Sequence, residues 1–165
     1  MSHTPTRVTA EIEGDFVVFL IGARVNRWWN VRAWLPVFLA MPRMLRELSA
    51  KPELGLLGYE FHGTTTVQYW RSVEQLNAYA AAREATHLPA WRAFNATARR
   101  AGAAVGIWHE TYLVGPGRYE NVFVNMPAKG ITKAGRVIEA SGRRTGAAGR
   151  LSATEQAASR AEAQE

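Results

Sequence analysis

The chain contains no cysteine. This absence excludes disulfide bonds, thiolate metal sites and a cysteine nucleophile. Long hydrophobic runs are also missing, because the most apolar stretch, residues 16–23, is far shorter than the roughly 20 residues that a membrane-spanning helix needs. Residues 1–13 are polar and show no signal-peptide pattern. We therefore expect a cytoplasmic protein with no membrane span.

Several sequence motifs that accompany common enzyme chemistries are absent. The chain has no glycine-rich dinucleotide fingerprint, no phosphate-binding loop, no zinc-type cluster and no serine nucleophile elbow. These absences argue against nicotinamide binding, phosphoryl transfer and hydrolase chemistry. The four histidines have no carboxylates nearby at metal-ligand spacing, so we expect no site that holds a metal ion alone.

Positive charge is present but is not concentrated. The net charge is +6, divided equally between residues 1–128 and the remaining residues, and neither part has a dense run of lysine and arginine. Nucleic-acid-binding proteins usually gather such residues on one face or in one run. We expect an ordinary solvated surface and no nucleic-acid partner.

The hydrophobic pattern predicts an α+β fold. Alternating or β-branched runs predict strands, and apolar residues at helical spacing predict helices. In chain order the pattern gives a strand over 15–25, a helix over 31–49, strands over 54–61 and 64–71, a helix that Ser72 caps, a helical piece over 87–100, and strands over 105–114 and 119–125. The first six elements follow the ferredoxin-like order, which predicts an antiparallel sheet with helices on one face.

Two features of this pattern predict local irregularities. Pro36 and Pro42 lie inside the helical run, and an interior proline costs about 3 kcal/mol, so we expect a kink or two short helices. Gly55 and Gly58 lie in the second strand, where glycine often marks a bulge.

The expected sheet has more apolar residues than one helical layer can cover. Residues 15–25 are apolar on both faces, which is typical of a central strand. A second subunit packing sheet to sheet would cover the other face. We therefore predict a homodimer, a dimeric α+β barrel, with residues 119–125 near the contact.

The composition predicts three segments. Residues 1–14 are expected to be a flexible N-terminus, 15–127 the folded domain, and 128–165 a disordered basic tail rich in alanine, glycine and arginine. The tail has few large apolar side chains to offset its ordering entropy, although a marginal helix from about Ser152 is compatible with its composition.

Four groups of residues carry a resemblance to a known family. They are Asn26–Trp29 with Trp34–Pro36, Glu53–Gly58, Gln68–Ser72 with His87–Trp91, and Gly106–Tyr112. Over residues 10–127 they resemble the bacterial family described as domain of unknown function 4188, which is placed among the dimeric α+β barrels and is labelled monooxygenase-like. A more distant similarity is to the haem-dependent spheroidene monooxygenase type.

This resemblance implies a monooxygenase-like oxidoreductase acting on a small hydrophobic or aromatic molecule, with haem as a candidate cofactor. The wider superfamily contains cofactor-free monooxygenases, haem-degrading enzymes, haem-dependent aldoxime dehydratases and proteins that only bind ligands. A haem-dependent dehydratase and a non-enzymatic haem or small-molecule binding protein therefore remain as alternatives, since a fold does not fix a function.

Two histidines are candidate functional residues. His87 opens the second helical piece, and in haem-degrading relatives a histidine in the equivalent region ligates iron; the alternative is a helix-terminal residue bonded to backbone. Alternation places His109 with Val105 and Ile107 on one face of its strand and Glu110 on the other. His109 is then an axial haem ligand, a general base, or a hydrogen-bonded core histidine.

The end of the first strand gathers polar and aromatic residues. Arg24, Asn26 and Arg27 stand beside Trp28 and Trp29, which suggests a pocket rim. The resemblance implies a catalytic or distal-pocket role for Asn26. Arg24 is a further candidate catalytic residue, and Arg24 or Arg27 could hold a haem propionate. The chain has six tryptophans; they either pack in the core or form an aromatic wall, and Trp70 and Trp91 are the candidates for that wall.

Overall fold

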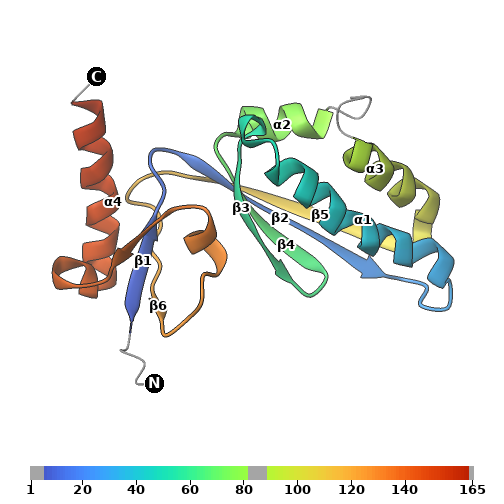
Figure 1. The fold of residues 1–165 in the computed structure, drawn as a ribbon, viewed down its shortest axis with the longest axis horizontal. Helices are drawn as coiled ribbons and strands as arrows, with labels where there is room; N and C mark the ends of the chain where they lie inside the picture. The colour runs from blue at the N-terminus through green and yellow to red at the C-terminus, as the bar shows by residue number, and fades with distance from the viewer. Residues whose placement is uncertain (1–5, 82–88, 164–165) are drawn as a thin grey trace.

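The structure, a computed structural model, describes residues 6–81 and 89–163 and contains a four-stranded antiparallel sheet flanked by helices (Figure 1). The strands lie in the order β3-β4-β2-β5. Helices α1, α2 and α3 all lie on one face of this sheet (Figure 1). The bounds are β2 Phe16–Val25, α1 Val31–Ser49, β3 Leu56–His62, β4 Thr65–Trp70, α2 Val73–Ala81, α3 Pro89–Ala101 and β5 Val105–Val114. The ferredoxin-like α+β fold predicted from the sequence is confirmed.

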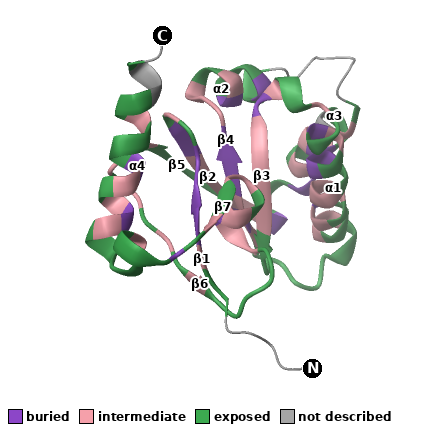
Figure 2. Cartoon of the chain, turned by 60° about the vertical axis from the view of Figure 1, so that its left-hand side comes forward, coloured by how far each residue is buried: buried purple, intermediate pink, exposed green. Residues whose placement is uncertain are grey.

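Strand β2 is central, as its apolar composition predicts. It pairs with β4 on one side and β5 on the other. Its residues alternate, so that Val17 and Phe19 pack against the helices, while Phe16 and Val18 pack on the opposite face. Figure 2 shows buried residues on β2 and β4, between the layers that flank them. The fully buried side chains of the helix-side core are Trp70, Leu45, Leu48 and Val37.

Helix α1 is continuous over 19 residues despite Pro36 and Pro42, so the prolines do not divide it into two short helices, which was one of the two outcomes expected from the sequence. One face of the helix buries Val37, Met44, Leu45 and Leu48. Burying each such side chain stabilises the fold by about 1.5–3 kcal/mol. The sum exceeds the cost of about 3 kcal/mol for each interior proline, and tertiary packing therefore holds the segment helical.

Two local predictions are confirmed. The pairing of β3 with β4 shifts register between Leu56 and Gly58, which is a β-bulge. The N-terminus of α2 is capped, because the backbone N–H of Gln75 donates to Oγ of Ser72 at 3.2 Å. The side chain of Gln75 turns instead to the carbonyl of Glu53.

The two terminal segments form a second, three-stranded sheet, which differs from the flexible N-terminus and disordered tail that the composition led us to expect. Strand β1 lies between β6 and β7. The remaining elements are β1 Arg7–Glu11, β6 Phe123–Val124, β7 Arg136–Glu139, the 3₁₀ helices Pro52–Leu54, Gly102–Ala104, Gly130–Lys133 and Gly142–Thr145, and α4 Ala147–Glu162. A count of apolar residues within one segment misses burial that arises only when distant segments pair.

Few apolar residues are needed to hold this second unit. Ala10, Ile12 and Ile131 are buried together with Phe16 and Tyr69 of the main sheet. The unit therefore covers one end of the sheet face opposite the helices. Residue Gly58 permits this contact, because a Cβ there would lie 2.7 Å from the carbonyl oxygen of Lys133.

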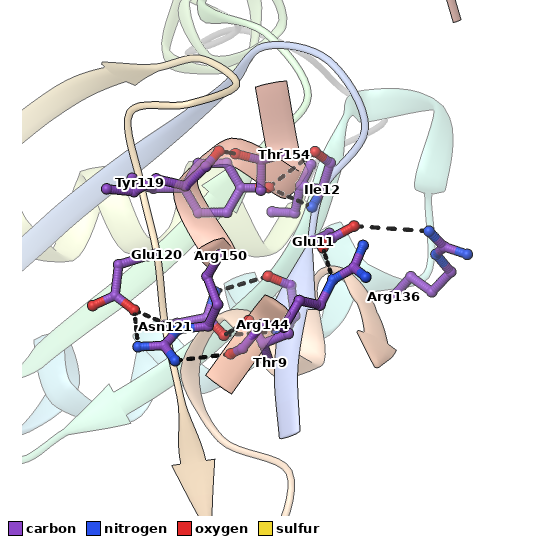
Figure 3. Close-up of polar contacts among 12 residues, drawn as sticks. Thr9, Glu11, Ile12, Tyr119, Glu120, Asn121, Arg136, Arg144, Arg150 and Thr154 are labelled. Atoms are coloured by element: carbon purple, nitrogen blue, oxygen red, sulfur yellow. Dashed lines mark hydrogen bonds and ion pairs between the residues drawn. The ribbon is translucent and has the colours of Figure 1, made fainter. Parts of the chain in front are cut away.

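Side chains rather than a long strand join the segment after β5 to β1 (Figure 3). Asn121 pairs with the backbone of Ala10, accepting from its N–H and donating to its carbonyl, both at 2.7 Å. The hydroxyl of Tyr119 does the same for Ile12 at 2.8 and 3.1 Å. These bonds replace strand pairing, so the strand predicted over residues 119–125 is reduced to Phe123–Val124.

Arg150 fixes helix α4 to the rest of the unit (Figure 3). It is only 6% exposed, and its guanidinium bonds Glu120 at 2.6 Å and the carbonyls of Arg144 and Thr145 at 3.0 and 2.9 Å. Arg144 in turn pairs with the buried Glu11 at 2.9 Å. Ion pairs and hydrogen bonds of these charged side chains thus supply the order that the tail's composition does not predict.

Candidate functional site

A cavity of about 160 Å³ lies between the main sheet and helices α1 and α3. The helices contribute Val37, Phe38, Met41, Pro42 and Phe94, and the sheet with the β3–β4 turn contributes Ile21, Gly22, Ala23, Phe61, Gly63, Thr64, Thr66 and Ile107. None of these lining residues is ionisable. The cavity is therefore suited to a neutral, mainly apolar molecule.

The size of the cavity limits its occupant. An apolar protein cavity of roughly 150 Å³ is known to admit benzene, whereas sites for drug-sized ligands measure about 300–1,000 Å³. At about 160 Å³, this cavity fits a molecule or substituent of about one ring.

A chain of buried hydrogen bonds runs along β4 toward this cavity. The indole N–H of Trp70 donates to Oε1 of Gln68 at 3.0 Å, and Nε2 of Gln68 donates to Oγ1 of Thr66 at 3.3 Å. Gln68 and Thr66 are each 2% exposed and Trp70 is fully buried. Thr66 is the last residue in this series of hydrogen bonds, and it also lines the cavity.

His109 lies on the helix-facing side of β5, a placement that the sequence could not decide. Its register partner on β2 is Ile21, whose partner on β4 is Thr66. The imidazole lies 5.6 Å from the ring of Phe19, measured between centroids, and the residue is exposed. His109 is outside the cavity lining, but Ile107, two residues earlier on the same face, is part of it. The imidazole is thus a neighbour of the cavity rim.

The predicted group at the end of the first strand does not meet His109. Arg24 follows Ala23 on the opposite face of β2 and is exposed. Asn26 bonds the backbone instead: its N–H donates to Ala104 at 2.9 Å and its side-chain amide to Ala103 at 3.4 Å. In the structure Asn26 joins the end of β2 to the segment before β5. It does not line the cavity, so the cavity gives no support to its predicted catalytic role.

The other predicted residues are divided between the core and the surface. Trp70 is a core side chain whose ring packs 5.4 Å from that of Tyr79, and it does not line the cavity. Arg27 is exposed, and so are the adjacent Trp28 and Trp29. Trp91 belongs to α3, and His87 lies outside the described residues.

The described residues do not fit haem in this arrangement. A haem macrocycle needs far more space than this cavity of about 160 Å³ offers, and His109 is not one of the residues that line the cavity. Haem binding stays a prediction. Within the described ranges there is also no group of three or more residues that could hold a metal ion.

Sequence reasoning missed Thr66 and Gln68. The signal was available in the third strand, Thr64–Arg71, where alternation places Thr66 and Gln68 on the same face as Trp70. Polar residues on the buried face of a central strand need partners. The sequence showed that requirement but not the cavity beside it.

A wider groove of about 660 Å³ lies between β7, the 3₁₀ helix Gly142–Thr145 and α4. Arg136, Arg143, Arg144 and Arg160 line it together with Glu11. Arg136 and Arg144 pair with the carboxylate of Glu11 at 3.8 and 2.9 Å, so half of these guanidinium groups are engaged inside the protein.

Comparison with known proteins supplies the context for the cavity. The family model described as monooxygenase af470-like matches residues 16–131, which include every element lining the cavity. The monooxygenase af470 of Aspergillus fumigatus is 32% identical over 127 residues, covering 68% of this chain and 44% of that protein. The chain therefore spans less than half of the length of this relative.

Proposed function

Since this chain belongs to the monooxygenase af470-like family, we propose that it is an oxidoreductase that transfers oxygen to a small apolar molecule held in the sheet–helix cavity. The observation that carries this proposal is the position of the cavity. It is formed by β2, β4, β5, α1 and α3, all within the matched residues, and nonpolar side chains dominate it. An apolar substrate and dioxygen both prefer such surroundings to water.

The proposed reaction requires a side chain that accepts a proton from the substrate. Oxygen insertion without a bound cofactor would convert a methylene group and dioxygen to a carbonyl group and water, and the substrate must lose protons in the process. We propose His109 as the proton acceptor, because it faces the helices beside the cavity rim and is exposed to solvent, with which it can exchange the proton.

A second candidate is a non-enzymatic binding protein for the same class of molecule. The observation that favours it is the absence of any ionisable side chain among the described lining residues. Such a protein would hold its ligand but consume no oxygen.

Oxygen consumption with a panel of one-ring alicyclic and aromatic compounds separates the two candidates. An oxidoreductase should consume dioxygen and release an oxidised product that mass spectrometry detects. Filling the cavity with Ala23→Leu should abolish that turnover, whereas Ala147→Leu, at an exposed position of α4, should leave it unchanged. Binding without oxygen consumption across the panel would favour the binding protein.

The role of His109 has its own matched control. His109→Gln keeps a polar side chain of similar size and should lower turnover by about 10²- to 10⁴-fold if His109 is the base. His62→Gln should have no effect, because His62 pairs with Thr65 on the face away from the helices. Equal activity in both variants would remove His109 from the mechanism.

A further inference from the structure

The direction of the hydrogen bonds along β4 is fixed by chemistry. An indole N–H only donates, so the atom of Gln68 that it reaches at 3.0 Å must be the amide oxygen. The amide nitrogen of Gln68 is consequently turned to Thr66, 3.3 Å away. Trp70 thereby determines which way the buried amide points.

Thr66 therefore receives a hydrogen bond and retains its own proton. Among the described residues, the hydroxyl donates only to the carbonyl oxygen of Ile21, at 3.5 Å. That separation is well beyond the usual 2.7–2.8 Å of a hydroxyl donor bond. A buried hydroxyl that makes only this weak bond has donor capacity to spare, and Thr66 lines the cavity.

We propose that the hydroxyl of Thr66 donates a hydrogen bond to an oxygen acceptor on the ligand, so that the cavity selects neutral one-ring molecules carrying a carbonyl-type oxygen over their hydrocarbon analogues. This inference rests on the proposed function, since it names the substrate class of the same cavity. Thr66 sets specificity, and Gln68 and Trp70 are positioning residues that keep its proton free.

The same series of hydrogen bonds disfavours the opposite arrangement, in which Thr66 would accept a hydrogen bond from the ligand. If Gln68 presented its oxygen to Thr66, the hydroxyl would donate to the amide and could only accept from a ligand. Trp70 prevents that orientation, because its N–H would then face the amide nitrogen and lose its acceptor in a fully buried place. The cavity therefore recognises an acceptor in preference to a donor.

The test compares two ligands of the same shape, cyclohexanone and methylenecyclohexane, which differ in carrying C=O or C=CH₂. Met41 lines the cavity and is one of four methionines, so the ¹³C-labelled Met41 methyl signal reports occupancy by NMR. Titrations give a dissociation constant for each ligand without any turnover.

Thr66→Val removes the hydroxyl and keeps the shape of the side chain. In this variant the dissociation constant of cyclohexanone should rise about two- to tenfold, the loss of one neutral hydrogen bond, while that of methylenecyclohexane should not rise. Thr66→Ser retains the hydroxyl and should keep the preference for the ketone. An unchanged ratio of the two constants in Thr66→Val would overturn the inference, and so would a Met41 signal that neither ligand shifts in the wild-type protein.

These outcomes separate the inference from the proposed function. Ketone selectivity that depends on Thr66, found together with no oxygen consumption, would reject the oxidoreductase and leave the recognition intact. Oxygen consumption without any dependence of binding on Thr66 would support the oxidoreductase and reject the recognition by Thr66.

Discussion

Trp108 lies across Gly22 on the sheet face opposite the helices. The two residues are register partners on β5 and β2, and a Cβ on Gly22 would come within 2.6 Å of Cε2 and Nε1 of Trp108. The glycine is thus required by the indole, which remains 41% exposed. Gly22 also lines the cavity. The indole of Trp108 therefore packs against a residue of the candidate site from the opposite face of the sheet.

The first prediction concerns this contact. Gly22→Ala should lower the free energy of unfolding by roughly 1–3 kcal/mol, because the added methyl group overpacks the indole. In a Trp108→Ala background the same substitution should cost much less. Urea unfolding of the four proteins gives the coupling, and additive effects would show that the indole does not constrain Gly22.

The second prediction concerns the homodimer, which remains a prediction from the sequence. On the sheet face opposite the helices, Trp108 and Tyr112 of β5 are exposed, and a second sheet packed face to face against this one would bury them. Light scattering should give twice the chain mass of 18.3 kDa. Trp108→Glu should shift the protein to the monomer, with His62→Glu at a hairpin end as the control; a folded wild-type monomer at micromolar concentration would contradict the dimer.

The third prediction reverses the expectation that the tail is dispensable. A chain ending at Ala128 would lose β7, the buried Ile131, and both Arg136 and Arg144, which pair with the buried carboxylate of Glu11. Removing one partner of a buried charge network costs about 3–5 kcal/mol, which corresponds to a fall in melting temperature of about 10 °C or more for a chain of this size. Calorimetry should show that fall, while a chain ending at Glu162 should melt like the full-length protein.

The fourth prediction is a pH dependence from Glu60. A hydrogen bond from the side chain of Lys133, reinforced by the backbone N–H of Gly130, lowers the pKa of Glu60 below its usual value of 4.5. A carboxyl group with a lowered folded pKa stabilises the fold above the unfolded pKa, and that stability is lost as the pH falls through the folded value. Wild-type stability should therefore decline below about pH 4.5, and Glu60→Gln should flatten that decline in urea midpoints measured over this range. An identical pH profile in both proteins would exclude the contribution of Glu60.

The sequence by itself determined the elements whose signals are local. β5 begins and ends where its β-branched and aromatic composition predicts, over Val105–Val114, and the cap at Ser72 follows from a hydroxyl placed three residues before Gln75. The order of these elements then restricted the fold to the ferredoxin-like arrangement. No membrane-crossing helix was expected, and none occurs within the residues that the structure describes.

Only the tertiary structure decided which face each strand shows to the helices. Alternation put His109 and Glu110 on opposite faces but could not say which face looks inward, because a period of two is symmetric. The tertiary structure also decided that the terminal segments fold, since Arg150 gains the carboxylate of Glu120, and Asn121 gains the backbone of Ala10, from residues 30 and 111 positions away in the chain. The cavity beside Thr66 exists for the same reason: local sequence fixes which side chains are available, but packing between β4, α1 and α3 fixes where they leave space.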